Sequence, residues 1–136
     1  MVWNLSEAVQ HSQKHAFLAS QDKCAERTRQ AIEAGGVTLM HHGSAKDYGS
    51  SLTLVGFQAK MINHLAQLEK GDIVVFQGFK GIPGTKKDHP HGHMAMYDGK
   101  HWISDFRQHH FYPGPDHQVA KPSFVVYRYK NSLANN

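Results

Sequence analysis

The sequence has 136 residues, of which 40% are hydrophobic and 19% charged, a composition that fits one globular domain over residues 1–136 and excludes a disordered tail or a coiled coil. The 15 Lys and Arg residues against 11 Asp and Glu give a net charge of +4, which favours anionic partners. A single cysteine excludes an internal disulfide framework and zinc sites built from several cysteines, and no apolar run approaches the roughly 20 residues that span a bilayer.

Helix signals fill the first part of the chain. Asn4 begins a capping box, which predicts a helix over residues 5–18. Ser20 is the next candidate N-cap, for a helix over residues 21–34 that places Cys24 in its first turn.

A third helix is expected between Ser44, which starts another capping box, and the stop at Gly56, and strands dominate after it. The apolar, alternating or β-branched runs that predict strands are residues 73–77, 93–97, 101–105 and 124–129. The glycine- and proline-rich stretch 78–92 and residues 107–122 are expected to form loops. Helices followed by a meander of strands predict an α+β fold, with N-terminal helices packed on an antiparallel β-sheet.

A hairpin is expected to bring two polar residues together. Asp98-Gly99 is typical of a type I′ turn between the two middle strands. With a two-residue loop, His93 lies opposite Ser104, and a bulge or another loop length brings it opposite Asp105. A carboxylate beside an imidazole fixes its tautomer, so His93 is a candidate general base and Asp105 its partner. The alternative for Asp105 is a turn residue at a strand end.

Cys24 has two interpretations. The N-terminus of a helix carries partial positive charge and free amides, which stabilise the thiolate that a nucleophile requires, and Lys23 adds positive charge beside it. The alternative is a small core residue on the buried face of the helix, since free cysteines are commonly buried and unreactive.

The 12 histidines raise the question of a metal site, above all in the run His89, His91 and His93. His91 and His93 would share one face of a strand, and His101, His109 and His110 could join them. The sequence has no cysteine pair and no His-Glu-x-x-His frame, so we predict no metal site and interpret most of these histidines as surface residues.

Three segments occur in an order that is typical of one enzyme superfamily. They are residues 22–32 (DKCAERTRQAI), 70–76 (KGDIVVF) and 92–99 (GHMAMYDG). The first is similar to a Cys-Ala helix start, the second to a Gly-Asp-hydrophobic strand and the third to a His-Val-Gly-Ile-Tyr-x-Gly strand. Together they resemble the papain-like peptidoglycan hydrolases of the NlpC/P60 and CHAP superfamily, and the resemblance covers roughly residues 20–106.

The resemblance implies a papain-like fold and a cysteine peptidase or amidase that hydrolyses amide bonds of cell-wall peptides. It assigns Cys24 as nucleophile, His93 as base and Asp105 as the third, polar member of the triad. Tyr48 and Gln108 are lesser candidates, for substrate contact or oxyanion support. No cofactor is implied, since a thiol nucleophile needs none.

One departure from the family pattern is His91, which stands two residues before His93 and could compete with it as the base. We favour His93 because it occupies the motif position. Two other functions stay open: a papain-like thiol hydrolase or deamidase that acts on another substrate, and a non-catalytic, histidine-rich module that binds metal or carbohydrate.

The first residues have no basic segment followed by an apolar one, so no Sec signal is expected. Small hydrolases of this kind resemble the amidase effectors exported by type VI secretion, or phage-derived lytic enzymes. That resemblance implies synthesis in a bacterial cytoplasm, action in the periplasm or wall of a target cell, and a cognate immunity protein as partner. We expect neither nucleic-acid binding nor membrane insertion.

Overall fold

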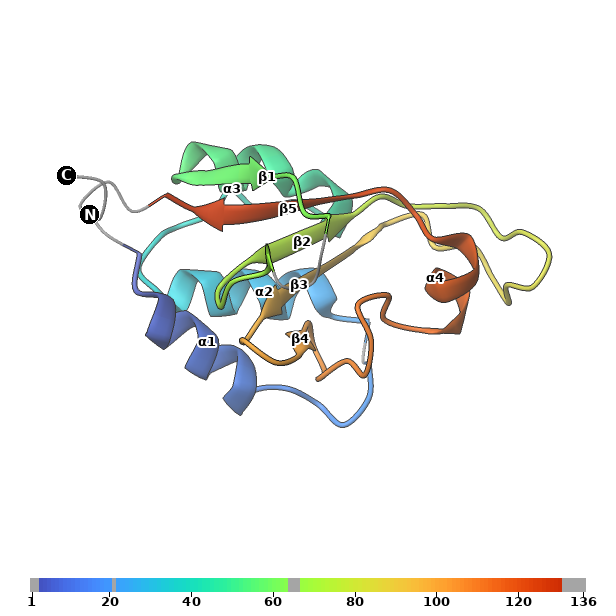
Figure 1. Cartoon of the computed structure of the whole chain (residues 1–136), viewed down its shortest axis with the longest axis horizontal. Helices are drawn as coiled ribbons and strands as arrows, with labels where there is room; N and C mark the ends of the chain where they lie inside the picture. Colours follow the sequence, from blue (N-terminus) through green and yellow to red (C-terminus); the bar gives the residue numbers. More distant parts are fainter. Residues whose placement is uncertain (1–2, 21, 64–66, 131–136) are drawn as a thin grey trace.

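The computed structural model describes residues 3–20, 22–63 and 67–130 (Figure 1). Its helices are α1 (Leu5–Lys14), α2 (Cys24–Ala34), the 3₁₀ helix η1 (Ala45–Asp47), α3 (Gly49–Leu54) and α4 (Pro115–Ala120). Its strands are β1 (Phe57–Lys60), β2 (Ile73–Phe76), β3 (His93–Tyr97), β4 (Trp102–Ile103) and β5 (Phe124–Tyr129). The predicted α+β class, with N-terminal helices on an antiparallel sheet, is confirmed. Within the described residues, no helix has the length and apolar character needed to cross a membrane.

The strands form a five-stranded sheet in the order β1-β5-β2-β3-β4, and every neighbouring pair is antiparallel. Strands β2, β3 and β4 form the expected meander, but the last strand of the chain returns to lie between β1 and β2 instead of extending it. Val74 in the middle of β2 lies opposite Ala95 on one side and Val126 on the other. Because β2 has neighbours on both edges and cover on both faces, all four of its residues are buried.

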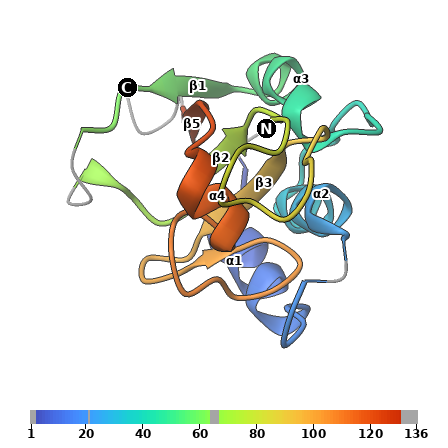
Figure 2. The same ribbon diagram turned by 90° about the vertical axis from the view of Figure 1, so that its right-hand side faces the viewer.

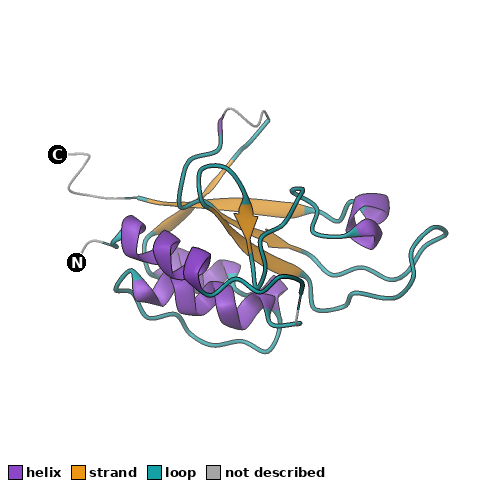
Figure 3. Ribbon diagram, turned by 90° about the horizontal axis from the view of Figure 1, so that it is seen from below, coloured by secondary structure: helices purple, strands orange, loops and turns teal. Residues whose placement is uncertain are grey.

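Helices α1 and α2 lie together on one face of the sheet (Figure 3). Alternate residues of the central strands, such as Ile73 and Met94, pack against them in the larger core. The residues between, such as Val74 and Phe76, face the other side, where aromatic residues of the 102–112 segment cover them. The helices thus hold one face of β3 in place, and irregular chain covers the other.

The helix boundaries differ from those expected. The Asn4 cap is confirmed, since its Oδ1 accepts a hydrogen bond from the Glu7 N–H (3.0 Å). However, α1 ends at Lys14, because the chain leaves the helix to form a β-bridge through Phe17. The second helix starts at Cys24 rather than residue 21, since Asp22 has a positive φ of 58° that no α-helix accepts.

Three further details correct the sequence-based expectations. The third helix splits into η1 and α3, since the hydroxyl of Ser44 binds His91 and does not cap the helix. Residues 107–122 contain α4, and β1 was not foreseen. The hairpin loop spans residues 98–101, closed by an Asp98 N–H···O His101 bond (2.9 Å). Tyr97 therefore lies opposite Trp102, whereas the two-residue loop expected from Asp98-Gly99 would place it opposite Lys100.

Candidate active site

Cys24 is the first residue of α2, and its thiol lies against β3. One turn later Thr28 donates a hydrogen bond from Oγ1 to the carbonyl of Met94 (3.1 Å), which fixes the helix to the strand. Burial raises the pKa of the Cys24 thiol, a hydrogen bond with the backbone of Met94 opposes this, and the negative charge of Asp105 adds to it. The net direction is upward, so the resting side chain is a neutral thiol.

His93 is the first residue of β3 and is 7% exposed. Gly92 before it has a φ of 72°, and a β-carbon there would collide with the carbonyl oxygen of Phe76 and with Lys46. Only glycine fits this position, because it tolerates a positive φ and leaves room for the neighbouring backbone. The turn delivers His93 to the cavity that Cys24 also lines.

The imidazole of His93 has one hydrogen-bond partner in Gln108, whose Oε1 lies 2.7 Å from Nε2. The Gln108 amide nitrogen donates to the carbonyls of His110 (3.0 Å) and Phe111 (3.1 Å). Since those two acceptors fix which end of the amide is NH₂, Oε1 must accept from His93. Nε2 therefore carries the hydrogen in the neutral ring, and Nδ1 has the lone pair that can take a proton.

The environment keeps His93 neutral. Burial lowers the pKa of its imidazole, while the hydrogen bond that it donates to Gln108 and the charge of Asp105 raise it less. A neutral imidazole with a free Nδ1 lone pair is the form that a general base needs before it accepts a proton.

Asp105, predicted as the third catalytic residue, is fully buried and belongs to the support of Cys24 as well. Its Oδ2 accepts hydrogen bonds from the Lys23 N–H (3.0 Å) and the Ser20 hydroxyl (3.3 Å). Ser20 therefore ties the segment before α2 to Asp105. The carboxylate also acts electrostatically on both Cys24 and His93.

Two cavities flank Cys24. One of about 460 Å³, here called the histidine cavity, is lined by Cys24, residues 87–93, Phe106, Pro113, Gly114 and His117, among others. The other, of about 400 Å³ and called the loop cavity, is lined by residues 22–26, Arg29, residues 41–43, Ala45, Tyr48, His91 and Gly92. Cys24 and His91 border both, so an extended ligand can lie across Cys24 with one part in each cavity.

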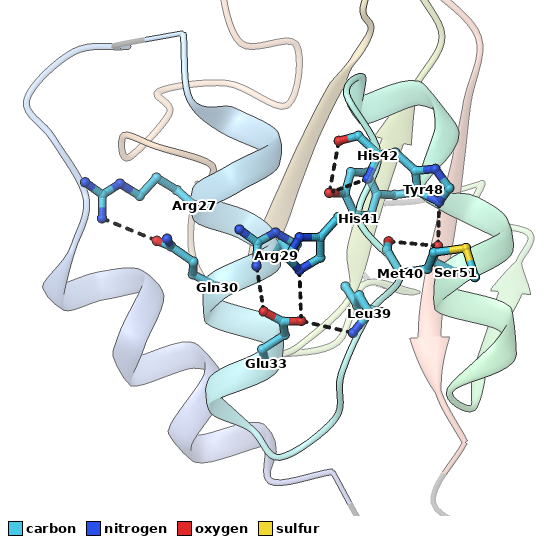
Figure 4. Close-up of polar contacts among 10 residues, drawn as sticks. All are labelled: Arg27, Arg29, Gln30, Glu33, Leu39, Met40, His41, His42, Tyr48 and Ser51. Carbon is cyan, nitrogen blue, oxygen red and sulfur yellow. Dashed lines mark hydrogen bonds and ion pairs between the residues drawn. The ribbon is translucent and has the colours of Figure 1, made fainter.

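Figure 4 shows how the wall of the loop cavity is held between α2 and α3. Glu33 on α2 accepts hydrogen bonds from Arg29 (2.7 Å) and from the Leu39 N–H (3.0 Å). His42 contacts the Ser51 hydroxyl through Nε2 at 2.6 Å. The polar groups that shape this wall are therefore paired within the protein.

Tyr48, predicted to contact substrate, is 2% exposed and lines the loop cavity. Its hydroxyl accepts a hydrogen bond from the His42 N–H (3.1 Å) and donates to the His42 carbonyl (3.3 Å). The hydroxyl thus holds the backbone at the edge of the cavity.

The remaining histidines of the run do not converge. His91 lies in a turn, and its Nδ1 is 2.7 Å from the Ser44 hydroxyl. His89 Nε2 lies 2.8 Å from Asp116 Oδ2 on α4. Among the residues that the structure describes, no group of three or more His, Cys, Asp or Glu side chains is arranged to hold a metal ion.

Gln108 is the residue whose position sequence reasoning predicted least well. It was a lesser candidate for substrate contact, whereas the structure places it on the imidazole of His93. The Gln108 N–H donates to the Trp102 carbonyl (2.8 Å) in a turn that follows β4. The only sequence signal for the contact with His93 is that Gln108 is a polar residue in an expected loop. The turn that brings it there is set by tertiary contacts, which the sequence does not show.

The chain is similar in structure to type VI effectors. It matches the native and the selenomethionine structures of the effector-immunity complex Tae3-Tai3 from Ralstonia pickettii. The native structure matches with a TM-score of 0.80 and 43% sequence identity, over 94% of this chain and 100% of the other. The selenomethionine structure matches with a TM-score of 0.77 and 46% identity, over 89% of this chain and 98% of the other. The effector Tae4 from Salmonella typhimurium, in complex with Tai4 from Enterobacter cloacae, shares the fold at 13% identity and TM-score 0.51, over 95% of this chain and 98% of the other. No protein-family profile and no curated protein matches the sequence.

Proposed function

The chain belongs to the Tae3 family of type VI effectors, and on this premise we propose that it is a cysteine amidase that hydrolyses amide bonds of bacterial cell-wall peptides. The observation that carries the proposal is that Cys24, at a helix start, and His93, whose Nε2 is occupied by Gln108, line the same cavity. This arrangement is typical of papain-like hydrolases, and we extend the proposal to a relationship with the NlpC/P60 and CHAP superfamily, with residues 1–136 as one hydrolase domain.

The reaction is a two-step acyl transfer. His93 takes the proton of the Cys24 thiol on Nδ1 as the sulfur attacks the carbonyl carbon of the scissile amide. The backbone amides at the start of α2 are donors for the oxyanion that forms. The imidazolium then gives the proton to the leaving amine, and a water molecule, activated by the same base, hydrolyses the thioester.

The directions of the pKa shifts favour a neutral pair over a preformed ion pair. Burial raises the pKa of Cys24 and lowers that of His93, and both effects disfavour charge in the free enzyme. The proton therefore moves during the attack. The substrate would then bind to an uncharged Cys24 and His93, and binding would not change the net charge of the site.

Two polar residues support the pair, and we propose distinct roles for them. Gln108 orients the ring, since its hydrogen bond on Nε2 leaves Nδ1 for the thiol. Asp105 completes the triad electrostatically: its buried carboxylate stabilises the imidazolium that forms, and it holds the Lys23 N–H at the start of α2. Asp105 thus links the nucleophile's helix to the base.

We propose that the wall peptide lies across both cavities, with the scissile amide at Cys24. Tyr48 contributes to the substrate site by holding the backbone of His42 at the edge of the loop cavity. The excess of basic residues suits a substrate rich in carboxylates. The chemistry needs no cofactor, so EDTA is expected to leave the activity unchanged.

The family also supports a place of action and a partner. Type VI effectors occur in the matched structures with immunity proteins, and we propose that a cognate immunity protein binds this chain too. The enzyme would then be made in the cytoplasm of one bacterium and act in the periplasm of another, with neither nucleic-acid binding nor membrane insertion.

The test is digestion of purified muropeptides followed by mass spectrometry of the products. The proposal expects a mass gain of one water for each amide cut, with the free amine and acid identified by fragmentation. Cys24→Ala is the matched control and should leave the muropeptides intact. Equal cleavage by the two proteins, or cleavage by neither, contradicts the proposal.

A further inference from the structure

His117 is a buried polar residue for which the mechanism above has no use. It lies on α4 and is 7% exposed, and its Nε2 is fully enclosed without a hydrogen-bond partner among the described residues. The neighbouring Asp116 is fully paired by contrast: its carboxylate accepts from the Lys86 N–H (2.7 Å) and contacts His89 (2.8 Å). An unpaired buried nitrogen costs stability, so its presence requires a reason.

The place of His117 suggests that reason. Its ring lines the histidine cavity together with Cys24 and His93, and its centroid lies 5.8 Å from that of His93. Figure 2 shows α4 beside the loop between β2 and β3, and residues 87–92 of that loop also line the cavity. On its other sides the ring packs against Phe79 (5.0 Å) and Phe76 (6.3 Å). An apolar ring would satisfy this packing better than an imidazole.

The ring is uncharged when the enzyme works. Burial lowers the pKa of His117 to about 4, and the nearby His93 and His89 lower it while Asp116 opposes them. In a neutral imidazole Nε2 either donates or accepts one hydrogen bond, according to the tautomer. Either role suits the C=O or the N–H of a peptide group, whereas a carboxylate would be matched by a cation.

The His117 ring lies close enough to the cavity to contact a bound ligand. The ring already borders the cavity, and the χ2 torsion of histidine has a broad energy profile, so a modest rotation turns a ring nitrogen towards a bound ligand. Phe106, Pro90 and Pro113 also line the cavity, so part of its wall is apolar.

We propose that His117 is a specificity-determining residue that hydrogen-bonds an uncharged peptide group of the substrate within the histidine cavity. The inference rests on the proposed function, because it takes the wall peptide as the ligand. It assigns the histidine cavity to recognition of peptide backbone by neutral groups, next to the reacting amide.

The experiment compares His117→Phe and His117→Leu, which keep an apolar filling and remove both nitrogens, with His117→Gln, which keeps a polar group. Affinity for an intact muropeptide is measured by calorimetry in the Cys24→Ala background, and kcat and KM are measured with Cys24 present. We expect His117→Phe or His117→Leu to weaken binding and raise KM about 3- to 10-fold with kcat within twofold, at an equal or higher Tm. His117→Gln should recover part of the affinity.

Each other outcome overturns the inference. Unchanged affinity in both apolar variants means that His117 does not touch substrate. A lower Tm with a lower kcat means that it acts through packing, and an effect that disappears at high salt points to a carboxylate and not a peptide group. In each of these outcomes the unaltered enzyme still cleaves muropeptides. If the proposed function is wrong, the unaltered enzyme cuts no muropeptide, so the two failures can be told apart.

Discussion

The two cavities that meet at Cys24 are built on different principles. In the loop cavity the polar groups of the wall are paired with one another, as Glu33 is with Arg29 and Tyr48 is with His42. In the histidine cavity the base His93 has one ring nitrogen occupied, and His117 has a nitrogen without a partner among the described residues. The hydrogen bonds of the loop cavity therefore fix the shape of its wall, whereas the histidine cavity has ring nitrogens that can still bond a ligand.

The difference teaches where to look for chemistry in a small cleft. A wall whose polar atoms are satisfied is rigid and contributes shape, so its substitution should change stability before activity. Buried polar or titratable groups without partners lower the stability of the folded protein, and a ligand or a reaction that uses them can offset this loss. We therefore expect substitutions on the two sides to separate into stability effects and activity effects.

The largest effect is expected at Cys24, which lines both cavities. Cys24→Ala should lower kcat/KM on a muropeptide about 10⁴-fold or more, since it removes the nucleophile from a group that acts as a unit. The melting midpoint should stay close to that of the unaltered protein, because little volume is lost from a half-buried position. Substantial residual hydrolysis by the alanine variant would exclude the thiol mechanism.

The second prediction compares a histidine of one cavity with a histidine of both. His93→Ala should cost at least about 10²-fold in kcat, as expected for loss of a general base. His91→Ala should cost less than about threefold, because the ring of His91 is engaged by Ser44 and lies in the turn before β3. Steady-state kinetics on one soluble muropeptide separates them, and the reverse ranking would move the base to His91.

The third prediction concerns the two residues that support the base. Gln108→Ala should lower kcat about 10-fold, since the ring of His93 loses the bond that fixes its tautomer. Asp105→Asn should have a smaller effect, because the isosteric amide can still accept from the Lys23 N–H. A larger loss in Asp105→Asn than in Gln108→Ala would make the carboxylate the orienting group, as the sequence predicts.

The pH profile gives an independent readout of the same pair. The hydrogen bond that His93 donates to Gln108 and the charge of Asp105 both raise the pKa of His93, against the larger effect of burial, which lowers it. Activity should fall in acid as His93 becomes protonated, with a midpoint below its ordinary 6.5. Each variant should move this acidic limb to lower pH, and a limb that moves upward in either would contradict the assigned contacts.

The sequence predicts best what local signals determine. The cap at Asn4, the position of Cys24 in a first helical turn and the strand that starts at His93 follow from capping, periodicity and glycine placement, and the structure confirms all three. The return of β5 between β1 and β2 could not be predicted, because the pairing joins segments far apart in the chain. Such register is set by how whole faces pack.

The sequence predicts Cys24 and His93 as nucleophile and base, and the structure places both on one cavity, but the sequence says less about the residues that support them. The loop at residues 98–101 is longer than expected because Asp98 Oδ1 accepts from the N–H groups of Lys100 and His101, which widens the turn. The register shift carries Asp105 towards the start of α2 and lets the turn after β4 bring Gln108 to His93. His117 escaped prediction because α4 lies in a stretch that has the composition of a loop.

The smallest effect on activity is expected at Tyr48, in the paired wall, and it is the counterpart of His117→Phe. Tyr48→Phe removes one hydroxyl and leaves the His42 N–H without its partner, so the free energy of unfolding should fall by about 1 kcal/mol. Urea denaturation measures this change, and kcat/KM should fall less than about threefold, because the ring still fills the wall. Ser51→Ala is the matched control on the other side of His42 and should behave alike. A tenfold loss of kcat/KM in Tyr48→Phe with unchanged stability would instead place the hydroxyl on the substrate and make the loop cavity a recognition surface equal to the histidine cavity.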